Sequence, residues 1–259
     1  MLILVIRWKM HEPEQWKKAQ AEAAKDPSKK TGNLGELFNA QNLRATIVGV
    51  SLATVGLITF WGCHIYGKNA LLRHAQTTAL TAEGVAGDAP KAEKLAVFAK
   101  HKAQIKTAEM TSMTLNTIGG GLGLVLFGWF SNRMGRRGAF VFYHVGAMAM
   151  VLLLFVVLIP NGASYTTLAI ALPIFGFLTL GMHAGYAVYF PELYPTRLRG
   201  TGTGFCFNMG RLGTAAYLLI MAKLQWAPEK TALYVAAIYL IGIFVALQGP
   251  ETRGKELPE

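Results

Sequence analysis

Charged residues are scarce in this sequence and unevenly distributed along it. Asp, Glu, Lys and Arg make up 15% of its 259 residues, whereas about a quarter of a typical soluble domain is charged. Long stretches carry almost no charge, and the Lys and Arg residues crowd between them, which predicts a polytopic membrane protein. The net charge of +11 would also suit a nucleic-acid binder. However, the basic residues stand at the ends of apolar runs rather than on a face with aromatic platforms, so no nucleic-acid partner is expected.

Cysteine is nearly absent as well, since Cys63 and Cys206 are the only two and both fall inside apolar runs. A disulfide framework is therefore not expected, and the spacing of the pair matches no zinc site. We predict no metal and no other cofactor.

Carboxylates are missing from the apolar runs, where Glu109 lies only at an edge. Proton-coupled carriers use intramembrane Asp, Glu or His residues, so coupling would depend on His64, His144 or His183, or on groups outside this chain. Facilitated diffusion without protons stays open. No paired aspartates lie in these runs, and the glycines at 119–123 lack the lysine of a phosphate-binding loop, so an enzyme is not expected.

The apolar runs divide the chain into four parts. Residues 1–6 are too few to cross a bilayer, which takes roughly 20 residues, so we interpret them as the end of a truncated transmembrane helix. Residues 7–43 form a basic linker with a surface helix, either solvated or lying against an anionic leaflet. Residues 44–248 hold the six-helix transmembrane bundle of an all-α membrane protein, and 249–259 are a polar tail. The spans are expected at about 44–66, 108–130, 139–159, 165–190, 200–223 and 230–248, with a long external loop at 68–107.

Arginines in the short loops predict the orientation of these spans. The gaps after the second and fourth spans and the C-terminal tail carry arginines, whereas the gap after the third span has no basic residue. Because Lys and Arg concentrate in cytoplasmic loops, these gaps, the linker and the C-terminus are expected in the cytoplasm. The chain is therefore predicted to be a multi-pass protein of the cell membrane, in contact with the lipid bilayer.

Three short motifs meet at this predicted cytoplasmic face: GWFSNRMGRR at 128–137, PELYPTRLRG at 191–200 and PETRG at 250–254. The motifs bring Arg and Glu together at span ends, where a carboxylate can accept forked hydrogen bonds from a guanidinium. A network that holds helix ends together in one conformation and releases them in another would act as a gate. A positively charged collar without a gating role is the alternative. The network residues are Asn132, Arg133, Arg136, Arg137, Glu192, Arg197, Arg199 and Glu251.

These motifs resemble those of the major facilitator superfamily, and the resemblance covers nearly the whole chain. GxxxNRxGRR is similar to the signature loop of its second half, and PELYPTRLRGTG with PETRG is similar to the sugar porters and related organic-solute carriers. The resemblance implies twelve spans in two six-helix halves, of which this chain would be the C-terminal half. A separate or missing N-terminal half would then be its partner.

The sequence departs from the superfamily pattern at two places, one in the signature loop and one in the first span. Asn132 stands where the signature loop usually has Asp, so the usual ion pair cannot form there. The paired glutamines of the sugar porters are absent after Arg44, which argues against a hexose carrier. The Phe60-Trp61-Gly62 pattern instead resembles metabolite:proton and aromatic-acid:proton symporters.

Arg211 lies in an apolar, glycine-rich stretch, where a charge needs a partner or a wet cavity. The alternative is that its side chain extends to a lipid headgroup. Transporters bind solute near the middle of the bilayer, and aromatic walls with a few polar groups suit a small polar or aromatic solute. The solute-binding candidates are Trp61, Asn116, Thr179, His183, Tyr186, Asn208 and Arg211.

The sequence thus predicts secondary active transport of a small organic solute by alternating access. The solute would be a sugar, an organic acid or an aromatic acid, and protons are a second candidate partner. The alternative is a non-transporting fragment, or a half-transporter that needs a separate N-terminal half.

Overall fold

The structure is a computed structural model, which describes residues 14–26 and 30–258. The expected truncated helix at 1–6 and the first residues of the linker lie outside the described residues. The described part contains helices and no strand, and five of its helices are long and apolar enough to cross a membrane. The prediction of an all-α membrane protein is therefore confirmed. These helices are Leu43–Ala82, Lys102–Leu158, Tyr165–Glu192, Arg199–Leu224 and Lys230–Gln248.

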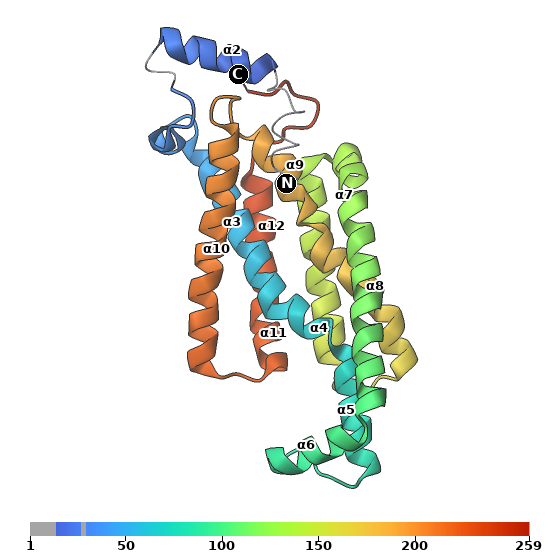
Figure 1. Cartoon of the computed structure of the whole chain (residues 1–259). Helices are drawn as coiled ribbons and strands as arrows, with labels where there is room; N and C mark the ends of the chain where they lie inside the picture. The colour runs from blue at the N-terminus through green and yellow to red at the C-terminus, as the bar shows by residue number, and fades with distance from the viewer. Residues whose placement is uncertain (1–13, 27–29, 259) are drawn as a thin grey trace, which may run out of the picture.

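The long helices are built from shorter elements that follow one another along the chain (Figure 1). In chain order they are α2 (Glu14–Lys25), η2 (Leu34–Phe38), α3 (Leu43–Thr59), η3 (Phe60–His64), α4 (Ile65–Gly67), α5 (Ala70–Ala82), α6 (Lys91–Lys100), α7 (Lys102–Leu152), η4 (Leu153–Leu158), α8 (Tyr165–Gly181), α9 (Ala184–Glu192), α10 (Arg199–Leu224), α11 (Pro228–Ala236) and α12 (Ile238–Gln248). Two of these, η3 and η4, are π-helical turns.

One helix, α7, contains two of the expected spans and folds back on itself between them (Figure 1). The reversal occurs at Gly135, whose φ of 80° and ψ of 168° lie in a region that side chains rarely allow. A Cβ at this position would also meet the carboxylate of Glu251. Five long helices therefore contain the six expected spans, while the exact span boundaries stay predictions.

Close packing of α7 against α8 depends on glycine. A Cβ on Gly119 would collide with the backbone carbonyl of Pro173, and one on Gly176 would collide with the carbonyl of Asn116. Helices can approach this closely only where side chains are absent. Pro173 itself predicts a kink, but α8 continues through it to Gly181, and the interruption comes at 182–183, just before α9.

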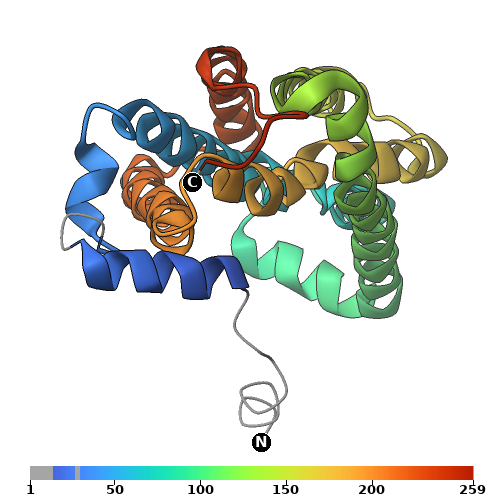
Figure 2. The same ribbon diagram turned by 90° about the horizontal axis from the view of Figure 1, so that it is seen from above.

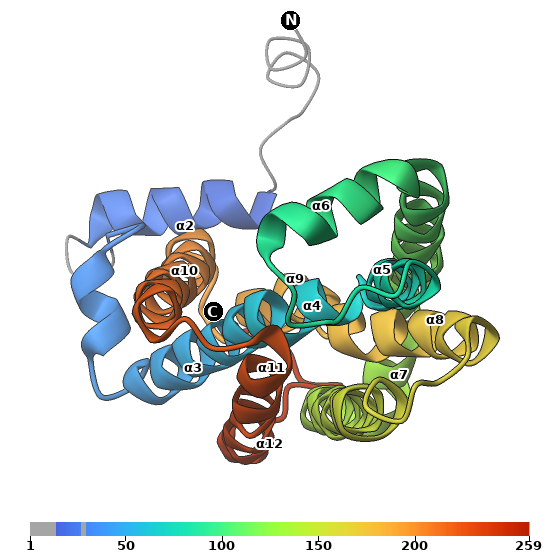
Figure 3. The same cartoon turned by 90° about the horizontal axis from the view of Figure 1, so that it is seen from below.

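The two ends of the bundle differ (Figure 1). At one end lie the turn within α7, the turn between α9 and α10 and the C-terminal segment. The helix α2 lies at the level of this end, and the view from above shows that it runs along one side of the bundle, beside α10 (Figure 2). We call this the arginine-rich end. At the other end α5 and α6 project beyond the bundle. Seen from that side, α12 lies between α3 and α7, α10 packs on α3, and α8 packs on α7 (Figure 3).

Candidate functional site

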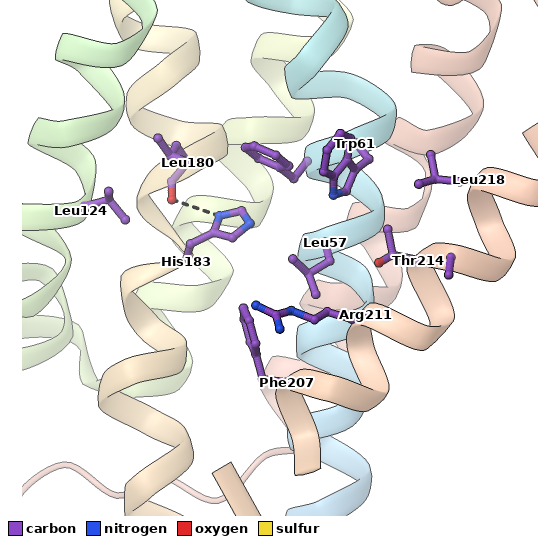
Figure 4. A pocket seen from close by; sticks show the side chains of 11 residues that line it. Leu57, Trp61, Leu124, Leu180, His183, Phe207, Arg211, Thr214 and Leu218 are labelled. Carbon is purple, nitrogen blue, oxygen red and sulfur yellow. Dashed lines mark hydrogen bonds between the residues drawn. The ribbon is translucent and has the colours of Figure 1, made fainter. Parts of the chain in front are cut away.

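Interruptions in two helices shape a cavity of about 570 Å³. On one side the π-helical turn η3 presents Phe60 and Trp61, and π-turns inserted into α-helices are frequent at functional sites. On the other side His183 lies at the break between α8 and α9 (Figure 4). The lining residues are Leu57, Phe60, Trp61, Leu124, Leu180, His183, Phe207, Arg211, Thr214, Ala215 and Leu218.

Arg211 gives this largely apolar cavity its charge. The guanidinium lies over the ring of Phe207, 4.8 Å from the centroid, and extends from α10 toward the α8–α9 side (Figure 4). Among the described residues it has no carboxylate partner, and the cavity lining contains no Asp or Glu. Arg211 is exposed, and at an exposed site a cation–π contact attracts the guanidinium by only about 0.5–1 kcal/mol, so its charge is left available to an anion.

Trp61 and His183 supply the other polar atoms near this charge. The Trp61 side chain remains 45% exposed, so the indole faces open space rather than the protein interior. His183 Nδ1 lies 3.1 Å from the carbonyl oxygen of Leu180 and donates to it, while its Nε2 is buried without a protein partner. A buried acceptor without a partner is costly, but protein atoms cover this nitrogen, so the ring contributes a wall of the cavity rather than an exposed acceptor.

Four of the sequence-predicted solute residues do not line the cavity. Tyr186 is buried and donates to the carbonyl oxygen of Leu52 at 3.2 Å. Asn208 is exposed and donates to the carbonyl oxygen of Gly204, one turn earlier in its own helix. Asn116 and Thr179 join His64 in a buried polar cluster behind Phe60.

The hydrogen bonds of this cluster assign the tautomer of His64. The Thr179 hydroxyl donates to the carbonyl oxygen of Phe175 at 2.6 Å, so it accepts from His64 Nδ1–H at 2.7 Å. His64 Nε2 then accepts from the Asn116 amide at 3.3 Å. The imidazole also stacks on Phe60, with ring centroids 4.9 Å apart. The cluster thus links η3 to α7 and α8 and supports the aromatic wall of the cavity.

Several residues that line the cavity were not among the predicted candidates, although two of them lie four residues before a predicted one. Phe207 precedes Arg211 by four residues and Leu57 precedes Trp61 by four, a separation that places side chains on one helix face. Phe60 and Thr214 could be assigned to the site only once η3 and α10 were seen to face each other across the cavity.

The arginine-rich end brings most of the predicted network into contact. Arg136 forms a fork with Glu192, with Nε–Oε2 at 2.8 Å and Nη2–Oε1 at 2.6 Å. Its Nη1 also donates to Oδ1 of Asn132 at 3.2 Å. The Thr252 hydroxyl donates to Glu192 at 2.5 Å. The reversal within α7, the end of α9 and the segment after α12 are therefore joined through two side chains that are 13% and 16% exposed.

Glu251 accepts backbone rather than guanidinium hydrogen bonds. The N–H groups of Arg136, Arg137 and Arg253 donate to its carboxylate at 2.9, 3.2 and 3.0 Å. Partial burial by itself would raise the pKa of this carboxyl, but these N–H groups stabilise the ionised form and bring the pKa below its usual value.

The side chains of four predicted network arginines lie outside this cluster, and that of Arg137 donates to the carbonyl oxygen of Leu247. Arg133 stacks over Trp129, 4.8 Å from the ring centroid. Arg197 forms an ion pair with Glu36 of the linker, and Arg199 donates to the carbonyl oxygen of Pro191. The linker partner could not be predicted from the motifs, because Glu36 is 161 residues away in the sequence.

Comparison of the sequence with known proteins identifies the family of this chain. The family model described as "Sugar (and other) transporter" matches residues 96–259, which is more than half of the chain. The chain belongs to this transporter family. The resemblance to the sugar-porter branch of the major facilitator superfamily is thereby confirmed, and the chain is a multi-pass membrane protein.

Curated relatives of this family member are transport proteins with different solutes in their names. The cis,cis-muconate transport protein of Acinetobacter baylyi is 34% identical over 43% of this chain and 26% of its own length. The inner membrane metabolite transport protein YgcS of Escherichia coli is 31% identical over 58% and 33%. The sialic acid transporter NanX of the same species is 26% identical over 56% and 35%. The chain thus spans about a quarter to a third of the length of these relatives.

Proposed function

We propose that this family member transports a small organic acid across the cell membrane, with Arg211 as the ligand of its carboxylate. The observation that carries this proposal is the cavity itself, in which one guanidinium without a carboxylate partner among the described residues lies between aromatic walls. A carboxylate would complete the hydrogen bonds of the guanidinium fork, and Phe60, Trp61 and Phe207 would cover an apolar or aromatic body. A neutral sugar would leave the charge unmatched.

The names of two relatives support an acid as the solute. One is named for cis,cis-muconate and the other for sialic acid, and both names denote organic acids. The position of Trp61 suits a hydroxyl or carbonyl oxygen on such a solute, because its exposed indole supplies an N–H donor at the cavity.

We further propose that transport proceeds by alternating access between this chain and a second six-helix half, without a catalytic step. The exposed rim at Trp61, Arg211 and Leu218 is where that half would complete the site. The Arg136–Glu192 fork would close the arginine-rich end in one conformation. The linker and the C-terminus would lie in the cytoplasm with this end.

The test is uptake into sealed vesicles that contain the chain alone or the chain co-expressed with a six-helix first half. We expect the pair to take up cis,cis-muconate or sialic acid but not glucose. Replacing Arg211 by Gln removes a charge-assisted fork, a loss of about 1.5–3 kcal/mol, so KM should rise roughly 10- to 150-fold. Arg211→Lys keeps the charge but loses the forked hydrogen bonds, so its KM should lie between the KM values of the wild type and Arg211→Gln.

A matched control removes a positive charge from the far end of the same helix. Lys223→Gln changes α10 outside the cavity and should leave KM unchanged. An unchanged KM in Arg211→Gln would show that this arginine is only a helix anchor. Absence of uptake by both preparations would leave a non-transporting chain. Uptake that collapses with the pH gradient would assign proton symport, and uptake that persists would assign facilitated diffusion.

A further inference from the structure

A second cavity lies at the arginine-rich end, on a face separate from the solute site. It measures about 410 Å³, lies between the first turns of α3 and the last turns of α12, and shares no residue with the solute cavity. Apolar side chains form most of its walls. Two of these side chains face outward, since Ile47 is 57% and Phe244 is 63% exposed. Both helices belong to segments long and apolar enough to span a membrane, so this groove opens toward the lipid.

Arg44 lines the head of this groove and Arg137 binds the neighbouring turn of α12, and neither guanidinium has a carboxylate partner among the described residues. Arg44 Nη2 donates to the carbonyl oxygen of Gln248 at 2.8 Å, and Arg137 Nη2 donates to that of Leu247. Both guanidinium groups thus bind the C-terminal carbonyls of α12, which orients them but does not neutralise them. Ion pairs to carboxylates at this end involve Arg136 and Arg197 instead, within the described residues.

Three carboxylates at this end already accept hydrogen bonds. Glu192 is bound by Arg136 and Thr252, Glu36 by Arg197, and Glu251 by three backbone N–H groups. Within the described part of the chain no carboxylate accepts a hydrogen bond from the guanidinium of Arg44 or Arg137, and that of Arg44 adjoins an apolar channel.

We propose that this groove binds one anionic glycerophospholipid. Its phosphate would accept hydrogen bonds from Arg44 and Arg137, whose forks match phosphate oxygens, and an acyl chain would lie over Ile47 and Phe244. A free anion would match the charge but leave the apolar walls exposed. A zwitterionic lipid would cover the walls but leave the net charge unmatched. The bound lipid would join the start of α3 to the end of α12 and stabilise this arrangement of the helices.

The test uses the purified full chain in detergent micelles doped with lipids that have identical acyl chains. Phosphatidylglycerol should raise the midpoint of thermal unfolding saturably, and native mass spectrometry should retain one such lipid per chain. Phosphatidylcholine and inorganic phosphate should do neither. Because charge-assisted hydrogen bonds are lost, Arg44→Gln should weaken the apparent affinity roughly tenfold or more.

Two further variants separate a built site from general charge. Lys255→Gln removes a positive charge from the exposed tail at the same end and should bind the lipid as the wild type does. Ile47→Trp fills the groove without changing any charge and should abolish retention of the lipid. For each variant, the midpoint of thermal unfolding with phosphatidylglycerol is compared with the midpoint with phosphatidylcholine. A general loss of stability lowers both midpoints equally and so does not change their difference. Equal effects of the two lipids, an equal shift with free phosphate, or normal retention in Ile47→Trp would overturn the proposal.

Discussion

Replacing Glu192 by Gln should open the arginine-rich end of this chain. The carboxylate accepts two hydrogen bonds from Arg136 and one from Thr252, and so joins α9 to α7 and to the segment after α12. Gln keeps the shape of the side chain but loses its charge and one acceptor. The perturbation therefore weakens the connection between helix ends without creating a cavity.

The structure sets the size of this effect. Removing one partner of a fully buried ion pair costs roughly 3–5 kcal/mol, but these side chains are 13% and 16% exposed, so water screens part of the charge left behind. We expect about 2–3 kcal/mol. Since about 1.4 kcal/mol corresponds to a factor of ten, the equilibrium between closed and open forms should shift roughly 30- to 150-fold toward the form open at this end.

Cysteine labelling in sealed vesicles measures the shift. Ala215 lines the solute cavity and is exposed, whereas the native Cys63 and Cys206 are fully buried and should react little. In vesicles that hold the chain with its proposed first half, Glu192→Gln should accelerate labelling of Ala215→Cys from the arginine-rich side. Glu256→Gln, in the exposed tail, is the charge-matched control.

An unchanged labelling rate in Glu192→Gln would refute the gating role and leave the arginines as a positively charged collar. A double-mutant cycle provides a readout that does not depend on the first half. Arg136→Gln and Glu192→Gln, alone and together in the purified chain, should show a coupling free energy of about 1–3 kcal/mol. Additive effects would show that the fork contributes nothing.

Two more predictions concern packing and pH. Gly119→Ala places a methyl group against the carbonyl of Pro173 and should cost about 1–3 kcal/mol, seen as a lower midpoint of thermal unfolding, while Gly121→Ala meets nothing within 4 Å and should cost nothing. An equal loss in both would contradict the close packing. Because the folded-state pKa of Glu251 is lowered, its stabilisation is present above the unfolded pKa of about 4.5 and is lost as the pH falls through the folded value. Glu251→Gln should therefore flatten the fall of the unfolding midpoint between pH 5 and pH 3, whereas Glu256→Gln should not.

Much of the fold follows from composition and spacing. Runs of about 20 apolar residues have few stable forms in a bilayer, because each backbone polar group must be paired within its own segment. For the same reason the all-α class and the approximate positions of the helices were predictable. The reversal between two expected spans could be predicted from the polar gap in the sequence. The way the chain turns within α7 depends on the positive φ of Gly135 and could not.

The site was only partly predictable. Arg211 stood out because a charge in an apolar helix is costly. It lines the cavity together with two other candidates, Trp61 and His183, and their contact with solute stays a prediction. Asn116, Thr179, Tyr186 and Asn208 share the same polarity and location in spans, yet their side chains bond to the protein itself. Polarity marks a residue as a candidate, but only its neighbours decide whether it is already satisfied.

The sequence by itself determined that this protein spans a membrane, that it carries transporter motifs and that arginines and glutamates gather at one end. These properties depend on residue type and short spacing. The tertiary structure decided that Arg136 rather than Arg133 binds Glu192, that Glu251 is bound by backbone N–H groups, and that Arg44 stands beside α12. The partners in these contacts come from different helices, far apart in the sequence, and their geometry depends on how those helices pack.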